Sequence, residues 1–301
     1  FLKKASKNMK KILLIGENIS NSLSPAIHNS ALEYLGLAEM YRYELMQIKP
    51  EDFDAAIKKI IEDKDVLGFN VTAPYKCAVI DYLDETDNFV QKCGACNYVK
   101  NENGRWKGKN TDGYGFVMPI IKMCLGISSK KAVIMGAGGA ARAVALQLIN
   151  NGVHSIALVN RDTARAEALK AHICRAAGFD NEKFIIYSYH DLQNEKFSSI
   201  MLSSDFIINA TSANFDDVRL PVRFSAEMFN KNQIIYDLSY IDKKNDDFKQ
   251  SARSAGAVYL DGREMLMYQA LVSFVQWTSK KPPFWLLRKV VQNACGEGAR
   301  K

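Results

Sequence analysis

The most restrictive feature of this sequence is residues 131–165, where a strand, a glycine-rich turn, a helix and a second strand follow without a gap. Four apolar residues, 132–135, predict a strand that is buried on both faces. They lead into a glycine-rich run at 136–141, and good helix formers with apolar residues at helical spacing follow at 142–151. This order predicts a βαβ unit of the kind that binds a dinucleotide.

Each position of the glycine turn has a physical role in this prediction. Gly136 stands where a tight turn needs a positive φ or no side chain, and Gly138 lets the backbone approach a pyrophosphate. The small side chain of Ala141 lets the helix lie close to the strand. Because the helix starts at the turn, its free N–H groups and positive dipole end favour phosphate binding there.

The residues after the next strand indicate which cofactor is bound. This strand is expected at 155–159, and Asn160 and Arg161 follow it where a dinucleotide site meets the adenosine ribose. An acidic residue there would accept the ribose hydroxyls of NAD, but Arg161 and Arg165, expected on one face of the following helix, suit the 2′-phosphate of NADP. The pattern favours NADP over NAD, and Asp162 opposes that preference. The competing interpretation is an ordinary strand-to-helix turn with two solvated arginines.

Length and composition are those of a soluble protein of two domains. The chain has 301 residues, of which 48% are hydrophobic and 24% charged. No apolar run is long enough to span a bilayer, and the apolar segment at 12–15 is too short for a signal peptide. We therefore expect a cytoplasmic protein without membrane partners, with Met9 as a candidate natural start.

The net charge of +7 raises the possibility of a nucleic-acid partner. Many of the basic residues lie near the two ends of the chain, and the sequence has no nucleic-acid recognition motif and no basic stripe within a helix. Solvated basic tails explain the charge, so we expect no nucleic-acid partner.

The six cysteines have no regular spacing, which suits a reducing compartment. Cys93 and Cys96 do have the CxxC spacing of redox proteins. However, no second pair accompanies them to form a zinc site, and the strand-to-motif-to-helix context of thioredoxin-like proteins is missing. We expect neither a disulfide nor a bound metal here.

Two serines near the N-terminus form a candidate anion site. Ser24 is expected to be the N-cap of a helix with Pro25 at its first position and Gly36 at its end. Ser22 and Ser24, two residues apart in a segment expected to be extended, would point the same way beside that helix N-terminus. Two hydroxyls and a helix dipole suit a carboxylate, but Ser24 could equally serve as a cap alone.

Further polar residues follow the predicted strands. Residues 72–76 come directly after the strand at 66–71, where an α/β sheet usually presents functional side chains, and they end in Lys76. A lysine there is on its own most often a solvated surface residue. Residues 84–92 predict a helix, and Asp112 is expected to cap a helix at 114–125.

Eight short motifs together resemble the shikimate dehydrogenase family, including its quinate/shikimate dehydrogenase relatives. They occur in the family's order over residues 15–277: SLSPAIHN at 22–29, GFNVTAPYK at 68–76, GACN at 94–97, NTDGYG at 110–115, GAGGAARA at 136–143, NR with a later arginine at 160–165, NATS at 209–212 and DGREMLMYQA at 261–270. Each motif is weak alone, but eight in order are specific.

The resemblance implies an α/β fold of two domains. The N-terminal α/β substrate-binding catalytic domain would comprise residues 9–113 and 262–295, because the C-terminal helices return to it. The Rossmann-like NADP-binding domain would comprise residues 114–261. The activity implied is the reversible reduction of 3-dehydroshikimate to shikimate by NADPH, a step of aromatic amino-acid (chorismate) biosynthesis.

The resemblance also implies roles for individual residues. Those that would bind substrate are Ser22, Ser24, Thr72, Asn97, Tyr240 and Gln269. Those that would bind cofactor are Gly136, Ala137, Gly138, Gly139, Ala140, Asn160, Arg161, Arg165, Thr211 and Gly262. Lys76 and Asp112 would form the catalytic pair. Hydride transfer to a ketone builds negative charge on its oxygen, and a lysine held by a carboxylate can supply both the cation and the proton required there.

Several positions depart from the family pattern. NATS is followed by residues 213–215 in place of the usual glycine and methionine, and 241–246 replace a usual Asn-Pro and later Thr. Glu264 replaces a usual glycine, and Cys96 and Tyr98 flank Asn97 where smaller residues are commoner. These departures concern nicotinamide placement and substrate identity, while Lys76 and Asp112 are retained.

Besides a shikimate-specific enzyme, three kinds of protein therefore stay open. One is a quinate/shikimate dehydrogenase paralogue, although Ser24 favours shikimate because quinate-preferring relatives often change that serine. The second is an amino-shikimate dehydrogenase, and the third is a non-catalytic ligand-sensing relative. Retention of both Lys76 and Asp112 argues against a sensor, and a monomer or a homodimer is expected.

Overall fold

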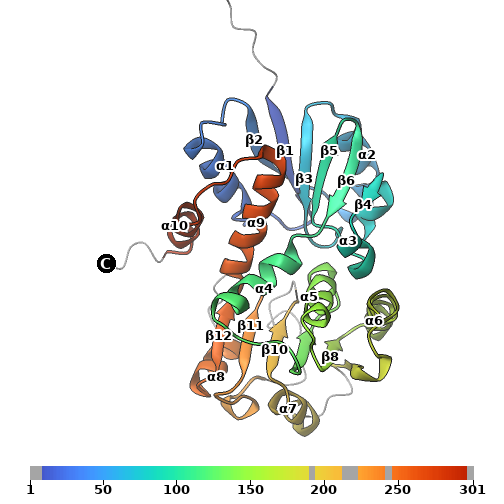
Figure 1. The fold of residues 1–301 in the computed structure, drawn as a ribbon, viewed down its shortest axis with the longest axis vertical. Coiled ribbons are helices and arrows are strands. Elements are labelled where there is room, and N and C mark those ends of the chain that lie inside the picture. The colour runs from blue at the N-terminus through green and yellow to red at the C-terminus, as the bar shows by residue number, and fades with distance from the viewer. Residues whose placement is uncertain (1–8, 190–193, 212–222, 241–245, 297–301) are drawn as a thin grey trace, which may run out of the picture. The chain divides into compact units, whose positions relative to one another are not determined.

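The computed structural model describes residues 9–189, 194–211, 223–240 and 246–296 (Figure 1). It divides into two compact units. The first unit comprises the chain up to Gln91, Ala95–Thr111 and the chain from Met267, and the second comprises Lys92–Gly94 and Asp112–Leu266. The expected α/β fold class is confirmed, since each unit has a six-stranded sheet with helices. No described helix is long and apolar enough to cross a membrane.

The first unit contains a mixed sheet. Its elements are β1 (Lys10–Gly16), α1 (Ser24–Tyr34), β2 (Tyr41–Gln47), η1 (Pro50–Asp52), α2 (Phe53–Glu62), β3 (Val66–Val71), η2 (Ala78–Tyr82), β4 (Glu85–Thr86), α3 (Asn88–Cys93), β5 (Tyr98–Glu102), β6 (Arg105–Lys109), α9 (Gly262–Thr278) and α10 (Phe284–Ala294). The strand order is β2-β1-β3-β5-β6-β4. The β1–β2, β1–β3 and β4–β6 pairs are parallel, and β5 pairs antiparallel with β3 and β6.

Alternate side chains of β1 enter two different cores. Leu13 and Ile15 pack on the face covered by α2, whereas Ile12 and Leu14 pack on the face that carries Trp277 of α9. This alternation is the period-two pattern of a strand buried on both sides. The two terminal segments of the chain meet in the second of these cores, so α9 from Met267 onward is an integral part of the first unit (Figure 1).

The second unit contains a sheet in which every pair is parallel. Its elements are α4 (Asp112–Lys122), β7 (Lys131–Met135), α5 (Gly139–Asn150), β8 (Ser155–Asn160), α6 (Thr163–Ala177), η3 (Asn181–Lys183), β9 (Phe184–Ser188), α7 (Asn194–Leu202), β10 (Phe206–Asn209), η4 (Ala226–Met228), β11 (Ile234–Asp237), α8 (Asp247–Ser254) and β12 (Val258–Asp261). The order β12-β11-β10-β7-β8-β9 reverses at β7, as in the Rossmann dinucleotide-binding fold.

Helices cover both faces of this parallel sheet. The core that includes Ile134 contains side chains of α4, α5 and α6, and the core that includes Val133 contains side chains of α7 and α8. Strands buried on both faces explain why residues 132–135 and 206–208 read as continuous apolar runs. Sheets of this kind bind ligands at the point where the strand order reverses, which here lies between β7 and β10.

Two expected helices differ from the structure. The helix expected at 84–92 is instead the short strand β4 followed by α3, because residues 85 and 86 pair with β6. The helix expected at 114–125 is α4, which begins earlier, at Asp112, so Asp112 is its first residue rather than its cap. The predictions that concern residues 1–8, 213–215 and 241–245 lie outside the described residues.

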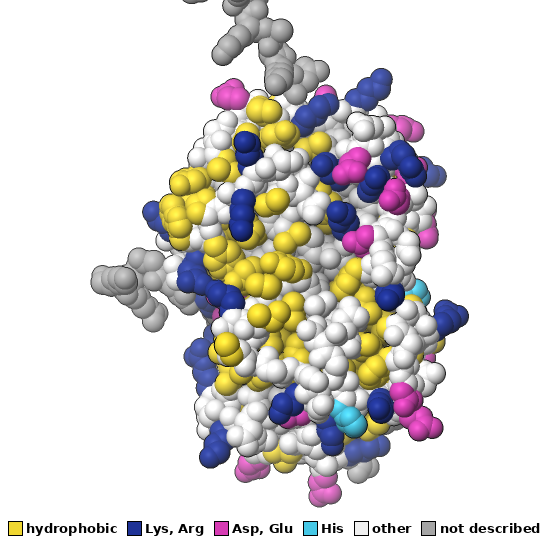
Figure 2. Space-filling view, in the orientation of Figure 1, with side chains coloured by type: hydrophobic (Ala, Val, Ile, Leu, Met, Phe, Trp, Pro, Cys, Tyr) yellow, Lys and Arg dark blue, Asp and Glu magenta, His cyan; other side chains and the backbone are white. Residues whose placement is uncertain are grey.

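Charged side chains on the β5–β6 hairpin are mixed in sign. Figure 2 shows lysines and arginines interspersed with acidic residues over this part of the first unit. Lys107 lies 3.3 Å from Glu102 and 3.4 Å from Glu85, and Lys100 lies 3.7 Å from Glu102. Lys100 and Lys107 of this hairpin therefore form ion pairs with neighbouring carboxylates.

Candidate active site

The glycine turn joins β7 to α5 in the second unit. Gly136 has φ +103°, and a Cβ placed there would lie 3.0 Å from the carbonyl carbon and oxygen of Ala210 on the neighbouring strand connection. A side chain at this position is therefore excluded both by conformation and by space. The predicted positive φ at Gly136 is confirmed.

Helix α5 begins at Gly139, three residues before the predicted start at 142. Gly138 is its N-cap, and no side chain caps this end. The backbone N–H groups of the first turn point out of the helix start without a side-chain acceptor, in a segment built only of glycine and alanine. This arrangement suits a pyrophosphate that approaches the backbone closely.

The acidic residue after β8 has a structural role. Asp162 is the N-cap of α6, and its Oδ1 accepts a hydrogen bond from the backbone N–H of Arg165 at 3.0 Å. A carboxylate used in this way satisfies a helix N–H. From the sequence, Asp162 was an argument against NADP. Because its carboxylate caps a helix in the structure, that argument is weaker.

Arg165 is directed toward the glycine turn. Its Nη2 lies 4.0 Å from the position that a Cβ on Gly138 would occupy. The expectation that Arg161 shares a helix face with Arg165 is wrong, because α6 starts at Thr163 and Asp162 has an extended backbone. Arg161 instead lies in the bend between Asn160 and the helix. Both arginines are exposed.

A hydrogen-bonded cluster holds the carboxyl ends of β10 and β11. The hydroxyl of Thr211 donates to Asn209 Oδ1 at 2.7 Å, and Asn209 Nδ2 donates to Asp237 Oδ1 at 2.8 Å. The same carboxylate oxygen accepts from the backbone N–H of Ser239 at 3.0 Å. Asn209 and Asp237 are almost fully buried. Sequence reasoning selected Thr211 but missed these two partners, although each of them is the last residue of a strand in a dinucleotide-binding sheet.

Gly262 and Tyr240 lie beyond this cluster. Gly262 is the first residue of α9, and its N–H donates to the carbonyl oxygen of Ser239 at 3.0 Å. A Cβ at Gly262 would collide with the carbonyl oxygen of Leu238, so only glycine fits. Tyr240 follows β11 and is half-buried.

The two candidate serines of the first unit stand at the start of α1. The helix begins at Ser24 with Leu23 as its N-cap, so the prediction that Ser24 is the cap is wrong. Leu23 has helical backbone angles, and the segment is therefore not extended as expected. Ser22 Oγ accepts a hydrogen bond from the backbone N–H of Ser24 at 3.2 Å, which brings the two residues together by another route.

The turn from Thr72 to Lys76 is anchored on both sides. The N–H of Thr72 donates to the carbonyl of Ile15 at 2.9 Å, and the carbonyl of Lys76 accepts from the N–H of Cys96 at 2.7 Å. Between them, the Tyr75 ring stacks on Phe53 at a centroid distance of 4.3 Å, and the Ala73–Pro74 peptide bond is cis. The two backbone hydrogen bonds hold the segment that carries the half-buried Lys76.

Asn97 and Gln269 are brought together by the fold, although 172 positions separate them in the chain. Asn97 Nδ2 donates to Gln269 Oε1 at 3.4 Å and to Thr111 Oγ1 at 3.0 Å. The backbone N–H of Thr111 donates to Asn97 Oδ1 at 2.7 Å. Sequence reasoning missed Thr111, which the NTDGYG motif contains but which was not singled out.

The polar cluster extends behind Thr111. Ser273 Oγ lies 3.4 Å from Thr111 Oγ1, and Asn70 Nδ2 donates to Ser273 Oγ at 3.3 Å and to the Asn97 carbonyl at 2.9 Å. Tyr43 donates its hydroxyl to Asn70 Oδ1 at 2.9 Å. Buried polar groups with several mutual partners rigidify a site. No periodicity in the sequence identifies these residues, because the contacts join β2, β3 and α9.

The remaining predicted residues are placed as follows. Asp112 is buried at the start of α4 in the second unit, whereas Lys76 belongs to the first unit. Cys93 and Cys96 are both buried, and neither forms a disulfide. Among the described residues, no group of three or more histidine, cysteine or acidic side chains could hold a metal ion.

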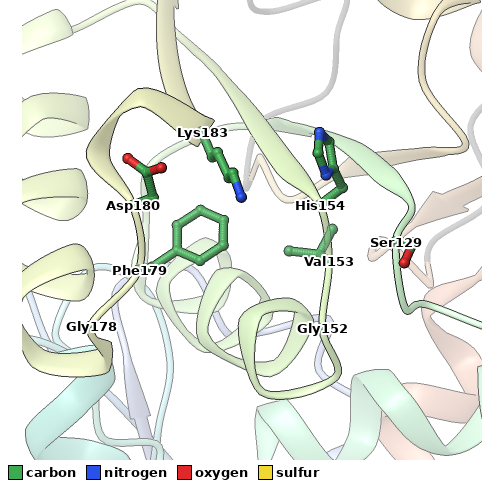
Figure 3. Close-up of a pocket in the computed structure, with 8 residues that line it drawn as sticks. All are labelled: Ser129, Gly152, Val153, His154, Gly178, Phe179, Asp180 and Lys183. Carbon is green, nitrogen blue, oxygen red and sulfur yellow. The ribbon is translucent and has the colours of Figure 1, made fainter.

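A pocket of about 370 Å³ in the second unit is distinct from the glycine turn (Figure 3). Its lining residues are Ser129, Gly152, Val153, His154, Gly178, Phe179, Asp180 and Lys183. These residues precede β7, β8 and β9, at the amino ends of the strands. Because parallel α/β sheets bind ligands beyond the carboxyl ends of their strands, we assign no part of the cofactor site to this pocket.

Comparison with known proteins identifies the family. A family model described as "Shikimate dehydrogenase substrate binding domain" matches residues 14–99, and one described as "Shikimate / quinate 5-dehydrogenase" matches residues 120–239. A protein of Moorella thermoacetica named shikimate dehydrogenase (NADP(+)) is 34% identical over 95% of this chain and 93% of its own length. The chain belongs to the shikimate dehydrogenase family.

Solved structures of the shikimate dehydrogenase family share the fold. A shikimate dehydrogenase in complex with NADP+ is 32% identical, with a TM-score of 0.79 over 97% of this chain and 96% of the other. A quinate dehydrogenase from Corynebacterium glutamicum in complex with NAD is 26% identical, with a TM-score of 0.76 over 95% and 99% of the two chains. The expected family and the expected two-part α/β architecture are thereby confirmed.

Proposed function

We propose that this protein catalyses the NADP-dependent, reversible reduction of 3-dehydroshikimate to shikimate, a step of aromatic amino-acid biosynthesis. The observation that carries the proposal is the nearly full-length similarity to a protein named shikimate dehydrogenase (NADP(+)). Two features of the chain agree with it. One is a glycine turn with Arg165 beside it, and the other is a buried amide cluster suited to a ring with several hydroxyls.

The residues of the second unit fit a dinucleotide with a 2′-phosphate. The pyrophosphate would be held by the backbone at Gly136, Ala137, Gly138, Gly139 and Ala140, where no side chain fits at Gly136. Asn160, Arg161 and Arg165 would hold the phosphorylated ribose, with Asp162 already used as a helix cap. Thr211, which follows β10, and Gly262, which follows β12, would line the rest of the cofactor site. When bound, NADPH supplies the hydride.

Six residues are proposed to hold the substrate, five of them in the first unit. Ser22 and Ser24 at the start of α1 would bind its carboxylate through their hydroxyls and the helix N-terminus. Thr72, Asn97 and Gln269 would hydrogen-bond the ring hydroxyls, and Tyr240 would contribute from the second unit. The Asn97 and Gln269 amides, held at 3.4 Å from each other, support this assignment.

Lys76 and Asp112 are proposed to carry the proton transfer. As the ketone is reduced, negative charge develops on its oxygen, and the ammonium of Lys76 would stabilise that charge and then donate a proton. The Asp112 carboxylate would fix the position of Lys76 for this step. In the reverse direction, neutral Lys76 would accept the hydroxyl proton. The anchored turn before Lys76 supports a defined position for this group.

The roles of the two domains, the cellular location and the oligomeric state are also part of the proposal. Residues 9–113 and 262–295 would form the substrate-binding domain, and residues 114–261 the NADP-binding domain. The irregular spacing of the six cysteines agrees with a reducing compartment. We propose a cytoplasmic monomer or homodimer that acts on small molecules and not on nucleic acids.

A quinate-preferring dehydrogenase is the second candidate. The fold is also that of a quinate dehydrogenase solved with NAD, so architecture alone does not separate the two substrates. An amino-shikimate dehydrogenase and a non-catalytic sensor are the third and fourth candidates. A sensor needs substrate contacts but no proton-transfer pair, so substitution of Lys76 separates it from an enzyme.

The test is the initial rate of cofactor reduction with shikimate or quinate, each against NADP+ or NAD+. We expect kcat/KM to be highest for shikimate with NADP+. Lys76→Ala should lower kcat by at least about 100-fold while shikimate binding survives, since proton transfer typically contributes 10² or more. A preference for quinate would overturn the assignment of shikimate as substrate, and a preference for NAD+ would overturn the assignment of NADP as cofactor. Absence of turnover in all four pairs would favour the sensor.

A further inference from the structure

The hydrogen bonds around Thr111 determine the orientation of two amide side chains. Oxygen and nitrogen of an Asn or Gln amide are distinguished by their partners, since the oxygen accepts and the nitrogen donates. The backbone N–H of Thr111 can only donate, and it lies 2.7 Å from one amide atom of Asn97. That atom is therefore Oδ1, and the nitrogen of Asn97 is directed toward Thr111 Oγ1 and Gln269.

The orientation of Gln269 follows from that of Asn97. Asn97 Nδ2 can only donate, so the Gln269 atom at 3.4 Å from it is the oxygen, Oε1. The same oxygen lies 3.4 Å from Thr111 Oγ1, and it is one of two amide oxygens within reach of the threonine hydroxyl proton, with Asn97 Oδ1 at 3.2 Å. Both contacts hold the oxygen of Gln269 inside the cluster and turn Nε2 away from it.

Ser273 and Asn70 fix the position of the Thr111 hydroxyl from behind. Ser273 donates its proton to the Gln269 carbonyl, one turn earlier in α9, at 2.9 Å. Its oxygen is then an acceptor for Asn70 Nδ2 at 3.3 Å, and it lies 3.4 Å from Thr111 Oγ1. Asn70, Thr111 and Ser273 are each at most 5% exposed, so water does not compete for these bonds.

The amide nitrogen of Gln269 is left to face a ligand. Among the residues that the structure describes, Gln269 Nε2 has no hydrogen-bond partner, while Oε1 has two. Gln269 is only half-buried, in contrast to the cluster behind it. A group that presents N–H donors selects an acceptor, and a hydroxyl oxygen or a ketone oxygen both qualify.

We propose that Thr111, supported by Asn70 and Ser273, is a positioning residue that orients Gln269 so that its amide nitrogen donates a hydrogen bond to an oxygen of the substrate ring. The inference rests on the proposed function for the identity of the substrate. It adds to that function a defined polarity at Gln269 and three residues that act through it. A donor at this position serves both redox states of a reversible dehydrogenase, because alcohol and ketone oxygens both accept.

Thr111→Val and Thr111→Ser form a matched pair for the test. Valine keeps the shape but removes the hydroxyl, whereas serine keeps the hydroxyl. In Thr111→Val we expect the KM for shikimate to rise about 3- to 10-fold, the effect of one misplaced hydrogen bond, with a smaller change in kcat. Thr111→Ser should restore the parent value. The KM for NADP+ should not change in either variant, and far-UV circular dichroism checks that both fold.

A double-mutant cycle separates positioning through Gln269 from a general structural role. The backbone N–H of Thr111 holds Asn97 Oδ1 in both Thr111 variants, although Thr111→Val also removes the hydroxyl that accepts from Asn97 Nδ2 at 3.0 Å. The positioning role predicts that most of the effect of the hydroxyl passes through Gln269. In a Gln269→Ala background, Thr111→Val should therefore change the KM for shikimate by less than about twofold. If Thr111→Val does not fold, Ser273→Ala takes its place in the same cycle.

Three outcomes are decisive. An equal effect of Thr111→Val with and without Gln269 would overturn the positioning role, as would a KM in Thr111→Val equal to that of the parent. In both cases, parent turnover of shikimate leaves the proposed function intact. If the parent itself fails to turn over shikimate, the proposed function is overturned, and with it the assignment of the ring oxygen.

Discussion

His28 shows how burial alone sets the chemistry of one residue. It is 1% exposed, its ring stacks on Tyr43 at 4.3 Å, and Phe274 and Trp277 lie at 6.1 and 5.6 Å. Neither ring nitrogen has a hydrogen-bond partner among the described residues. Removal from water disfavours the charged imidazolium and lowers the pKa of His28 from 6.5 to about 3.

The lowered pKa of His28 predicts a specific acid sensitivity. Between the unfolded pKa of 6.5 and the folded pKa of about 3, the unfolded chain binds one proton more than the folded chain. The free energy of unfolding should therefore fall as the pH falls through this window, by about 1 kcal/mol per pH unit from this residue. Urea unfolding at pH 7.0, 5.5 and 4.5 measures the slope. His28→Phe should flatten it.

The control for this prediction is the exposed histidine His154. His154→Phe should leave the pH slope equal to that of the parent protein. An unchanged slope in His28→Phe would show that other groups cause the acid sensitivity, and that His28 is accessible to protons in the folded state.

Individual site residues were predictable from the sequence where a local rule applies. Gly136 could be selected because a tight strand-to-helix turn requires its conformation. The role of Asp162 could not be read from the sequence, since a carboxylate after a strand is equally suited to a ribose or to a helix cap. Thr111 and Ser273 were missed because their contacts join segments 162 positions apart.

At the scale of elements, prediction succeeded where hydrophobic periodicity is strong. The strand at 66–71 was predicted at its observed bounds, since its residues are buried in a sheet interior. The prediction of one helix over residues 84–92 was wrong because a two-residue strand such as β4 carries no periodicity. The pairing of β4 with β6 also outweighs the helix propensity of its residues. The helix α7 was not predicted, although its side chains contribute to the core around Val133.

Helix α9 closes one face of the first sheet through Trp277. Its indole Nε1 donates to the Val99 carbonyl at 3.1 Å, and its ring lies 4.9 Å from Tyr98. Gly68 lies beneath it, where a Cβ would collide with the indole. Strand β3 therefore has a glycine at the point where the large Trp277 side chain of α9 packs against it.

This packing predicts a graded loss of stability. Trp277→Ala should lower the free energy of unfolding by about 3–5 kcal/mol through the lost burial and the cavity. Trp277→Phe should cost about 1–3 kcal/mol, because the buried Val99 carbonyl loses its donor. Trp285, which is 57% exposed, gives the matched control, and Trp285→Ala should cost less than about 1 kcal/mol. Equal losses at Trp277 and Trp285, measured by urea unfolding with circular dichroism, would contradict the role assigned to α9.

For the whole molecule, the two units have separate cores. The clusters that contain Ile12, Leu13 and Phe274 belong to the first unit, and those that contain Val133 and Ile134 belong to the second. The first unit is assembled from three segments of the chain, with Met267 onward returning to strands formed at the start. Local patterns predict the elements of such a unit, but the return of the chain was expected only from the family resemblance.

Separate cores predict that the units unfold with different sensitivity to cofactor. All three tryptophans, Trp106, Trp277 and Trp285, lie in the first unit, so tryptophan fluorescence reports that unit, whereas circular dichroism reports both. NADP+ at 100 times its Kd should stabilise the second unit by about 2.7 kcal/mol, which raises its Tm by roughly 5–10 °C. We expect the transition monitored by circular dichroism to broaden and move upward while the fluorescence transition moves by less than about 2 °C, because the residues proposed to bind NADP+ all lie in the second unit. Coincident shifts of both probes would instead show that the two units unfold as one cooperative body, since a ligand held by one unit would then stabilise the other by the same free energy.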